Sequence, residues 1–149
     1  TKNSISELEF TLLKEQLKES GFEILQDQSK IKIDRIKTLL IEEISTLDIP
    51  EDFVLSKFIS EKLSSDYSAL SKLFSHTENY TIEQYFILQK VEKVKELLVY
   101  DEFTLTQISQ QLGYKSVQHL SNQFKKITGY APTQFQNLKK KSRIELDKI

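Results

Sequence analysis

Hydrophobic side chains in the second half of the chain recur at intervals of three and four residues, which is the spacing of helices. The pattern also repeats. Ile-Ser-x-x-Leu at 59–63 recurs at 108–112, and Leu-Ser-x-x-Phe at 70–74 recurs at 120–124. Each pair of patterns is typical of a short helix, a turn and a second helix packed through the apolar positions. The repeat therefore predicts two similar two-helix motifs.

A third periodic stretch lies between the two copies, with apolar residues at 85, 88, 91, 94 and 98. It predicts a helix over about 81–100, and Thr81 is a suitable N-cap. About twenty residues at 1.5 Å each give a helix of roughly 30 Å. That length is close to the ~34 Å between successive major grooves on one face of B-DNA. The helix can hold the two motifs one DNA turn apart, although an ordinary bundle helix has the same pattern.

The N-terminal third predicts a helix–strand–helix appendage. Leucines at 8, 12, 13 and 17 indicate a helix that ends at Gly21, and Phe22–Gln26 alternates like a short strand. Isoleucine and leucine at 33, 36, 40 and 44 indicate a second helix over 29–45. A single strand cannot satisfy its own backbone, so we expect it to pair with a preceding portion of the protein or with a second chain. A chain that opens at Thr1 and contains no Met also favours a preceding portion.

Composition favours helices and excludes several kinds of site. Only three Gly and two Pro are present, and there is no Cys, which excludes disulfides, thiolate nucleophiles and Cys-ligated metal sites. We therefore expect the reducing cytoplasm as the compartment. No apolar stretch approaches the roughly 20 residues that a membrane span needs, so we expect no membrane insertion.

Charge is distributed unevenly along the chain. Residues 1–80 contain ten basic and fifteen acidic side chains, a net charge of −5, whereas 81–149 contain eleven and seven, a net charge of +4. Between residues 103 and 144 there are seven basic side chains and no carboxylate. Such a segment is typical of a surface that faces a polyanion, and the simpler interpretation is a solvated cationic tail.

The second two-helix motif carries a family signature. Thr-Leu-Thr-Gln-Ile-Ser-Gln-Gln-Leu-Gly-Tyr at 104–114 is followed by Phe-Lys-Lys at 124–126, Gly129 and Pro132. This order of residues resembles the AraC/XylS signature. The glycines of this stretch have physical roles: Gly113 suits a turn with positive φ, and Gly129 suits a left-handed helix cap. Pro132 can begin the next helix.

The resemblance extends over about 52–138. The stretch 89–98 resembles the family's linker helix, with Lys90 where the family usually has Arg. The resemblance implies a sequence-specific bacterial transcription regulator, usually an activator, whose two helix-turn-helix motifs enter adjacent major grooves. Duplex DNA and RNA polymerase are then the expected partners, and no cofactor and no catalytic activity are expected.

The fold class that these patterns predict is mainly α, with two helix-turn-helix subdomains joined by a long linker helix and a small N-terminal helix–strand–helix appendage. The expected boundaries are 1–48 for the appendage, 52–142 for the DNA-binding domain (54–79 first motif, 81–100 linker helix, 104–129 second motif) and 143–149 for a tail. The appendage is weakly similar to the end of a ferredoxin-like heavy-metal-associated module. Its metal-binding half is absent here, so we expect no metal.

The second recognition helix supplies the main candidate site. Leu120 and Phe124 must face inward, which leaves polar residues on the outer face. Gln and Asn can form two hydrogen bonds with adenine, and a Val can contact a thymine methyl. The residues expected to read bases there are Val117, Gln118, Ser121 and Asn122. The residues expected to hold phosphates are Lys115, Lys125, Lys126 and Lys90.

The first motif is a weaker candidate. The repeat carries the family's DNA contacts onto Ser68, Ser71 and Lys72, but residues 51–80 have three basic and five acidic side chains, a net charge of −2. We therefore expect the second motif to dominate affinity. Besides Lys90, four positions depart from the family pattern: Asn79 replaces a usual Gly, His76 a usual Lys, Ala131 a usual Ser cap and Gln136 a common Arg.

Other functions fit less well. An enzyme is disfavoured because His76 and His119 are the only histidines, and Glu92 and Glu96 are expected to be a solvated pair rather than an acid/base couple. A protein-interaction module in which only the second motif touches DNA stays open, since residues 1–80 are acidic. RNA is less favoured because the exposed faces lack stacking aromatic rings.

Overall fold

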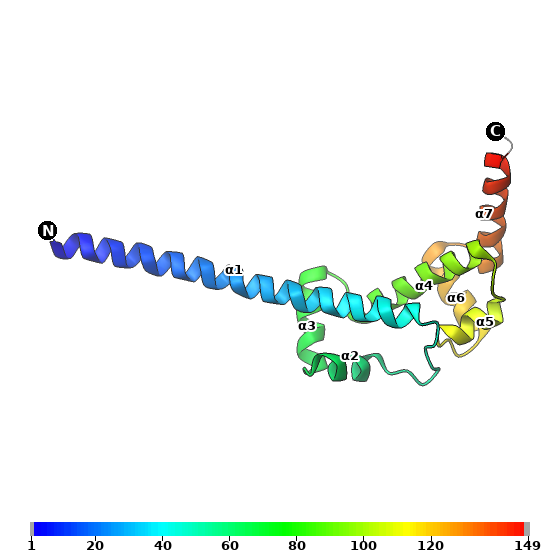
Figure 1. Cartoon of the computed structure of the whole chain (residues 1–149), viewed down its shortest axis with the longest axis horizontal. Coiled ribbons are helices and arrows are strands. Elements are labelled where there is room, and N and C mark those ends of the chain that lie inside the picture. Colours follow the sequence, from blue (N-terminus) through cyan, green and yellow to red (C-terminus); the bar gives the residue numbers. More distant parts are fainter. Residues whose placement is uncertain (1, 148–149) are drawn as a thin grey trace. The chain divides into compact units, whose positions relative to one another are not determined.

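The computed structural model describes the backbone of residues 2–147 and the side chains at positions 12, 15, 16 and 27–146. These residues form seven α-helices (Figure 1): α1 (Lys2–Ser45), α2 (Leu55–Leu63), α3 (Tyr67–Glu78), α4 (Ile82–Tyr100), α5 (Leu105–Gln111), α6 (Val117–Thr128) and α7 (Pro132–Asp147). The chain divides into two compact units, residues 1–36 and residues 37–149. No helix in the part of the chain that the structure describes is long and apolar enough to cross a membrane.

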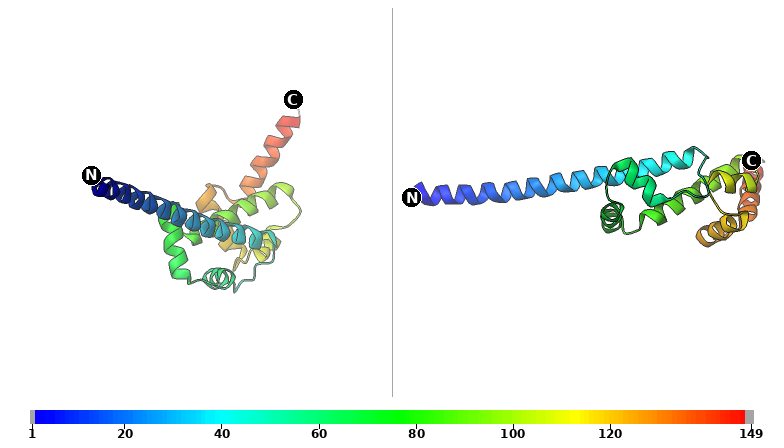
Figure 2. Two further views of the ribbon diagram at one scale, coloured as in Figure 1. Left: turned by 60° about the vertical axis from the view of Figure 1, so that its left-hand side comes forward. Right: turned by 90° about the horizontal axis from the view of Figure 1, so that it is seen from below.

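The second compact unit contains the predicted pair of helix-turn-helix motifs. The first motif is α2 with α3, and the second is α5 with α6. Figures 1 and 2 show α4 running from the first motif to the second, with α7 packed against α4. The prediction of a mainly helical fold, with two such motifs joined by one long helix, is confirmed.

The repeated apolar positions form the cores of the two motifs. Ile59 and Phe74 of the first motif are fully buried, and Ile108 and Leu120 of the second are equally buried. Leu63 is the exception, because it keeps part of its surface exposed. Burial of one side chain of this size contributes about 1.5–3 kcal/mol to the free energy of unfolding. Each copy of the pattern therefore stabilises one motif.

Polar side chains fix where the helices begin. Thr81 caps α4, and its hydroxyl accepts the Gln84 N–H while the Gln84 side chain accepts the Thr81 N–H. Thr104 and Gln107 form the same reciprocal pair at the start of α5. Each capping box satisfies two backbone N–H groups that the helix itself leaves without partners. The predicted N-cap at Thr81 is confirmed.

Left-handed residues end several of the helices. Asn79 ends α3 with φ 63° and Gly129 ends α6 with φ 84°. Asn tolerates this region better than most residues, so the replacement of a family Gly at 79 is accommodated. Pro132 begins α7 as predicted. The usual Ser cap before it is replaced by Ala131, which has no side-chain acceptor, and the Ala131 N–H donates to Gln134 Oε1 at 3.0 Å.

The strand predicted over Phe22–Gln26 is wrong. α1 is helical across these residues and across Gly21, which does not end the first helix. Five alternating residues carry little information, and a helix satisfies backbone groups that a lone strand would leave without partners. Over residues 2–147 the β-structure consists of one isolated bridge, between Ile49 and Leu112. Two expectations depended on this strand, self-association through it and the likeness to a ferredoxin-like module. Because the segment is helical, neither is supported.

The two glycines with positive φ provide a matched test of the turn between α5 and α6. Gly113 has φ 73°, and a Cβ there would lie 2.8 Å from Ile49 Cγ2. Gly129 has φ 84°, but a Cβ there would meet nothing within 4 Å. We expect Gly113→Ala to lower the free energy of unfolding by about 2–5 kcal/mol and Gly129→Ala by about 1–2 kcal/mol.

Urea titration of both variants and the parent chain measures this difference. Equal losses in the two variants would show that the close approach of Ile49 to residue 113 contributes nothing to stability.

Candidate nucleic-acid interface

The two faces of α6 differ sharply in chemistry. Leu120 and Phe124 point into the core, whereas Gln118 and Asn122 are exposed one helical turn apart. Gln118 Nε2 donates to Asn122 Oδ1 at 2.8 Å, so the two amides lie side by side on the outer face. A side-chain amide in such a place can form two hydrogen bonds with the major-groove edge of adenine. The structure thus brings together two of the residues predicted to read bases.

The start of α6 is held by its cap. The Ser116 hydroxyl accepts the His119 N–H at 3.0 Å. Val117 and Ser121, the other predicted base-reading residues of this helix, are partly buried at the edge of the outer face. His119 itself is exposed, and its ring lies edge-on to Tyr114 at 5.3 Å between centroids. The repeat pattern gave His119 no role, but its position places it on the same face as Asn122.

Three predicted phosphate-binding lysines surround this face. Lys115, Lys125 and Lys126 are all exposed. Among the residues that the structure describes, none of the three forms an ion pair with a carboxylate. Their charges are therefore not neutralised by neighbouring carboxylates, as a surface for phosphates requires.

The turn before α6 is fixed by an aromatic residue and a lysine. Tyr114 is buried, and its hydroxyl donates to Gln123 Oε1 on α6 at 2.8 Å. The Lys90 ammonium lies 4.1 Å from the centre of the Tyr114 ring and 3.4 Å from the carbonyl oxygen of Leu112. Burial raises the pKa of Tyr114 and lowers the pKa of Lys90 to about 8. α4 is thereby fastened to the turn that positions α6.

Lys90 does not fulfil the predicted role of a phosphate contact. Its side chain is only 9% exposed and points into the protein, over the rings of Phe86 and Tyr114. An ammonium in this place loses hydration, and the ring faces and a carbonyl replace part of it. The prediction fails because the position of the residue in the linker helix did not reveal which side of the helix would be covered.

The first motif presents a less cationic surface. Ser68 and Lys72 are exposed on α3 and Ser71 is partly buried, so the predicted residues lie together on one helix. Two carboxylates lie near its N-terminus. Asp66 caps α3 through the Ala69 N–H, and the Tyr67 hydroxyl donates to Glu83 of α4. These negative charges oppose phosphate binding there, in keeping with the weaker role predicted for this motif.

Gln136, which replaces a common Arg of the family, has a structural partner that sequence reasoning did not find. Its Nε2 donates to the Leu98 carbonyl oxygen at 3.1 Å and to Asp101 Oδ1 at 2.9 Å. Lys140 on the next turn of α7 pairs with Asp101 at 3.1 Å. These contacts join α7 to the C-terminal end of α4, so α7 is anchored beside the second motif.

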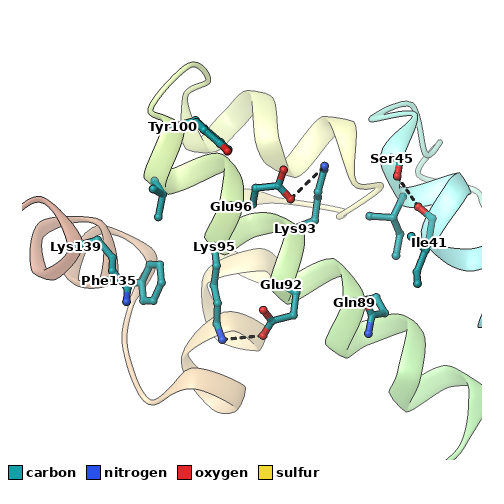
Figure 3. Close-up of a pocket in the computed structure, with 12 residues that line it drawn as sticks. Ile41, Ser45, Gln89, Glu92, Lys93, Lys95, Glu96, Tyr100, Phe135 and Lys139 are labelled. Atoms are coloured by element: carbon teal, nitrogen blue, oxygen red, sulfur yellow. Dashed lines mark hydrogen bonds and ion pairs between the residues drawn. The ribbon is translucent and has the colours of Figure 1, made fainter. Parts of the chain in front are cut away.

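A groove of about 570 Å³ lies between the end of α1, α4 and α7. Figure 3 shows Tyr100 and Phe135 at one end of it and Ile41 at the other. Glu92 and Glu96 line it as ion pairs on α4, with Lys95 at 2.8 Å and Lys93 at 3.4 Å respectively. Each carboxylate thus has a cationic partner one turn away, an arrangement typical of a solvated helix surface rather than of an acid/base couple.

No group of three or more His, Cys, Asp or Glu side chains gathers to hold a metal ion in the part of the chain for which side chains are described. His76 and His119 lie on different helix-turn-helix motifs, on α3 and α6. The outer face of α6 combines two exposed amides with exposed lysines, and it is the functional surface that the geometry favours.

Comparison with known proteins identifies relatives of this chain. A family model described as a helix-turn-helix domain matches residues 59–138. The uncharacterized HTH-type transcriptional regulator YdeC of Bacillus subtilis (strain 168) is 25% identical over 139 residues. That alignment covers 88% of this chain and 44% of YdeC, so the chain spans less than half the length of this relative.

Two solved structures share the arrangement of helices. The C-terminal domain of the two-component response regulator yesN from Fusobacterium nucleatum subsp. nucleatum ATCC 25586 is 29% identical with a TM-score of 0.57, covering 67% of this chain and 96% of that chain. The DNA-binding domain of AdpA, a global transcriptional factor solved in complex with a target DNA, is 14% identical with a TM-score of 0.64, covering 74% and 95%. At that identity the second likeness concerns the fold alone.

The burial of Lys90 predicts a specific dependence of stability on pH. Its pKa falls from the usual 10.5 to about 8 in the folded chain, so the unfolded chain binds more protons between these two values. The free energy of unfolding contributed by Lys90 must therefore rise with pH across this window and stay constant below it. We expect wild type to gain on the order of 1–3 kcal/mol relative to Lys90→Met between about pH 7.5 and about pH 10.

Urea titrations of the two proteins at both pH values measure this gain. The control is Lys126→Met, which removes an exposed ammonium and should differ from wild type by a constant amount. A difference between wild type and Lys90→Met that stays constant or falls with pH would contradict the burial of the ammonium.

Proposed function

Because the chain belongs to the AraC-type helix-turn-helix family of DNA-binding transcription regulators, we propose that it recognises specific duplex sequences with α3 and α6 in adjacent major grooves. Members of this family are regulators and not enzymes. The observation that carries the proposal is the outer face of α6, where two exposed amides lie among lysines that have no described carboxylate partner. Amides read base edges and unpaired lysines bind phosphates.

The length of α4 supports simultaneous binding by both motifs. Its 19 residues correspond to roughly 28 Å at 1.5 Å each, compared with ~34 Å between successive major grooves on one face of B-DNA. The fold alone resembles that of AdpA, which was solved with a target DNA. A helix of this length can hold α3 and α6 so that both reach the same side of a duplex.

The proposal assigns the two motifs unequal roles. We infer that Val117, Gln118, Ser121 and Asn122 read bases and that Lys115, Lys125 and Lys126 hold phosphates. Ser68, Ser71 and Lys72 would add a weaker local contact, because Asp66 and Glu83 place negative charge near the start of α3. The second candidate function is a protein-interaction module in which only α6 touches DNA. The same two carboxylates favour it, because they oppose contact between α3 and DNA phosphates.

The remaining parts of the proposal concern the whole regulator. A role as a bacterial activator that contacts RNA polymerase, and a cytoplasmic location, follow from the family resemblance. The division of the chain into an N-terminal segment ending near 48, a DNA-binding domain over 52–142 and a short tail is likewise proposed. YdeC is more than twice as long as the aligned segment, so whatever the whole of that regulator does is not carried over to this chain.

Site variants distinguish base reading from phosphate contact. A duplex is first selected from a randomised pool with the wild-type chain. Gln118→Ala should weaken binding to it by about 1–3 kcal/mol and relax the preference at one base pair, because an amide–adenine contact is lost. Lys125→Ala should weaken all duplexes alike and reduce the slope of log affinity against log salt by about one. Fluorescence anisotropy at several salt concentrations measures both effects.

Two further variants test the asymmetry. Lys72→Ala should cost less than Gln118→Ala, and the control Lys93→Ala, which removes a lysine paired with Glu96 on α4, should cost nothing. If no duplex associates even at low salt, DNA binding by this chain is refuted. A loss of specificity from Lys72→Ala as large as that from Gln118→Ala would refute the unequal roles, and preferential binding of duplex RNA would refute the choice of ligand.

A further inference from the structure

One continuous stretch of chain contacts both helix-turn-helix motifs without belonging to either. It comprises residues 37–50, the last turns of α1 and the extended connection to the first motif, and is here named the tie segment. It precedes the part of the chain that matches the helix-turn-helix family model, which begins at residue 59. Leu40 and Ile44 are buried, so the helical part of the tie segment packs against the protein.

At one end the tie segment contacts the first motif. The Lys37 ammonium pairs with Glu78 in the last turn of α3 at 3.1 Å, and each side chain keeps only about a quarter of its surface exposed (27% and 25%). The same ammonium lies 5.8 Å from the centre of the Tyr85 ring on α4. A partly buried pair is screened less than a surface pair, although its contribution to stability stays modest.

At the other end the tie segment contacts the second motif. The Ile49 N–H donates to the Gln111 carbonyl oxygen at 3.0 Å, and Ile49 forms a parallel bridge with Leu112. Ile49 is 3% exposed, and its Cγ2 occupies the space that a Cβ of Gly113 would need. This contact fills the turn that leads into α6.

The turn into α6 is therefore held from two sides. Ile49 binds the Gln111 carbonyl from the tie segment, and Lys90 donates to the Leu112 carbonyl from α4. Tyr114, in the same turn, bonds to Gln123 on α6. A displacement of Ile49 would thus reach the recognition helix through Gly113 and the buried Tyr114, because close-packed groups do not deform independently.

We propose that the tie segment is a second connection between the two motifs, parallel to α4, and that it sets the relative position of α3 and α6. The proposal rests on the proposed function for its consequence, which is discrimination between DNA half-site spacings. α4 also contacts both motifs, through Tyr85 beside Phe74 of α3 and through Lys90 at the turn before α6. The tie segment adds contacts that limit bending or rotation at the ends of α4, which would change the distance between α3 and α6. Ile49 and Lys37 oppose such motion, which makes them positioning residues and not base-reading ones.

The first experiment needs no DNA. The chain contains no Cys, so Thr77→Cys on α3 and Lys126→Cys on α6, both exposed positions, give two unique sites for spin labels. Pulsed electron–electron double resonance then measures the distribution of distances between the spin labels on the two helices. Adding Ile49→Ala should broaden that distribution, and adding Lys37→Ala should broaden it less, because an ion pair is weaker than a buried contact.

The matched control is Val54→Ala, which shortens a β-branched side chain that is 53% exposed just beyond the tie segment. It should leave the distance distribution unchanged. Circular dichroism and urea titration establish that each labelled variant is folded. If Ile49→Ala fails to fold, Ile49→Val and Lys37→Ala take its place, and an unbroadened distribution in both overturns the proposal.

The second experiment uses DNA. The duplex selected by the wild-type chain is remade with its half-sites moved together or apart by one or two base pairs. Wild type should bind the duplexes with altered spacing more weakly than the selected duplex. In Ile49→Ala the ratio of these affinities should fall by at least about fivefold, which is the lower end of typical coupling between distant sites. Val54→Ala should discriminate as wild type does.

The outcomes separate this proposal from the proposed function. If wild type binds no duplex, DNA reading fails, and the distance distributions still decide whether the tie segment positions the motifs. Unchanged distributions overturn the tie segment even where DNA binding is strong. A uniform loss of affinity at every spacing in Ile49→Ala, with an unchanged distribution, shows a role in stability alone and also overturns it.

Discussion

The close packing of the second helix-turn-helix motif depends on the absence of a side chain at residue 113. The turn there has a left-handed conformation, and the Ile49 side chain occupies the space into which a Cβ would point. The same turn places Tyr114 under the Lys90 ammonium and against Gln123 of α6. The orientation of the outer face of α6 therefore depends on a backbone constraint that lies outside that helix.

The polar side chains around this turn are of two kinds, those bonded to the protein backbone and those exposed to solvent. Residue type alone does not tell them apart. Lys90 and Gln136 donate hydrogen bonds to backbone carbonyls of the protein, those of Leu112 and Leu98. Lys125 and Lys126 have no described carboxylate partner and stay exposed. The same residue type thus has two different roles here. A buried lysine fastens α4 to the turn before α6, whereas an exposed lysine can bind a phosphate, and only burial distinguishes the two.

The asymmetry between the motifs has a simple electrostatic origin. Both motifs share one pattern of apolar residues in their cores, but the residues on their outer faces differ. Asp66 and Glu83 lie near the start of α3, whereas the segment from 103 to 144 contains no carboxylate. Two similar arrangements of helices therefore carry different surface charge, and this difference is the basis for proposing α6 as the stronger DNA contact.

The sequence by itself determined several features that depend on neighbours within one helical turn. The period of 3.6 residues identified the buried positions of both motifs, the capping residue Thr81 fixed the start of α4, and glycine at 113 and 129 marked the positive φ values. The short alternating run at 22–26 led to a wrong prediction of a strand, because five residues are too few to define a period. Only the tertiary structure decided that Lys90 is buried and that Ile49 holds the second motif, because those contacts join residues 22 and 62 positions apart and follow from packing rather than local pattern.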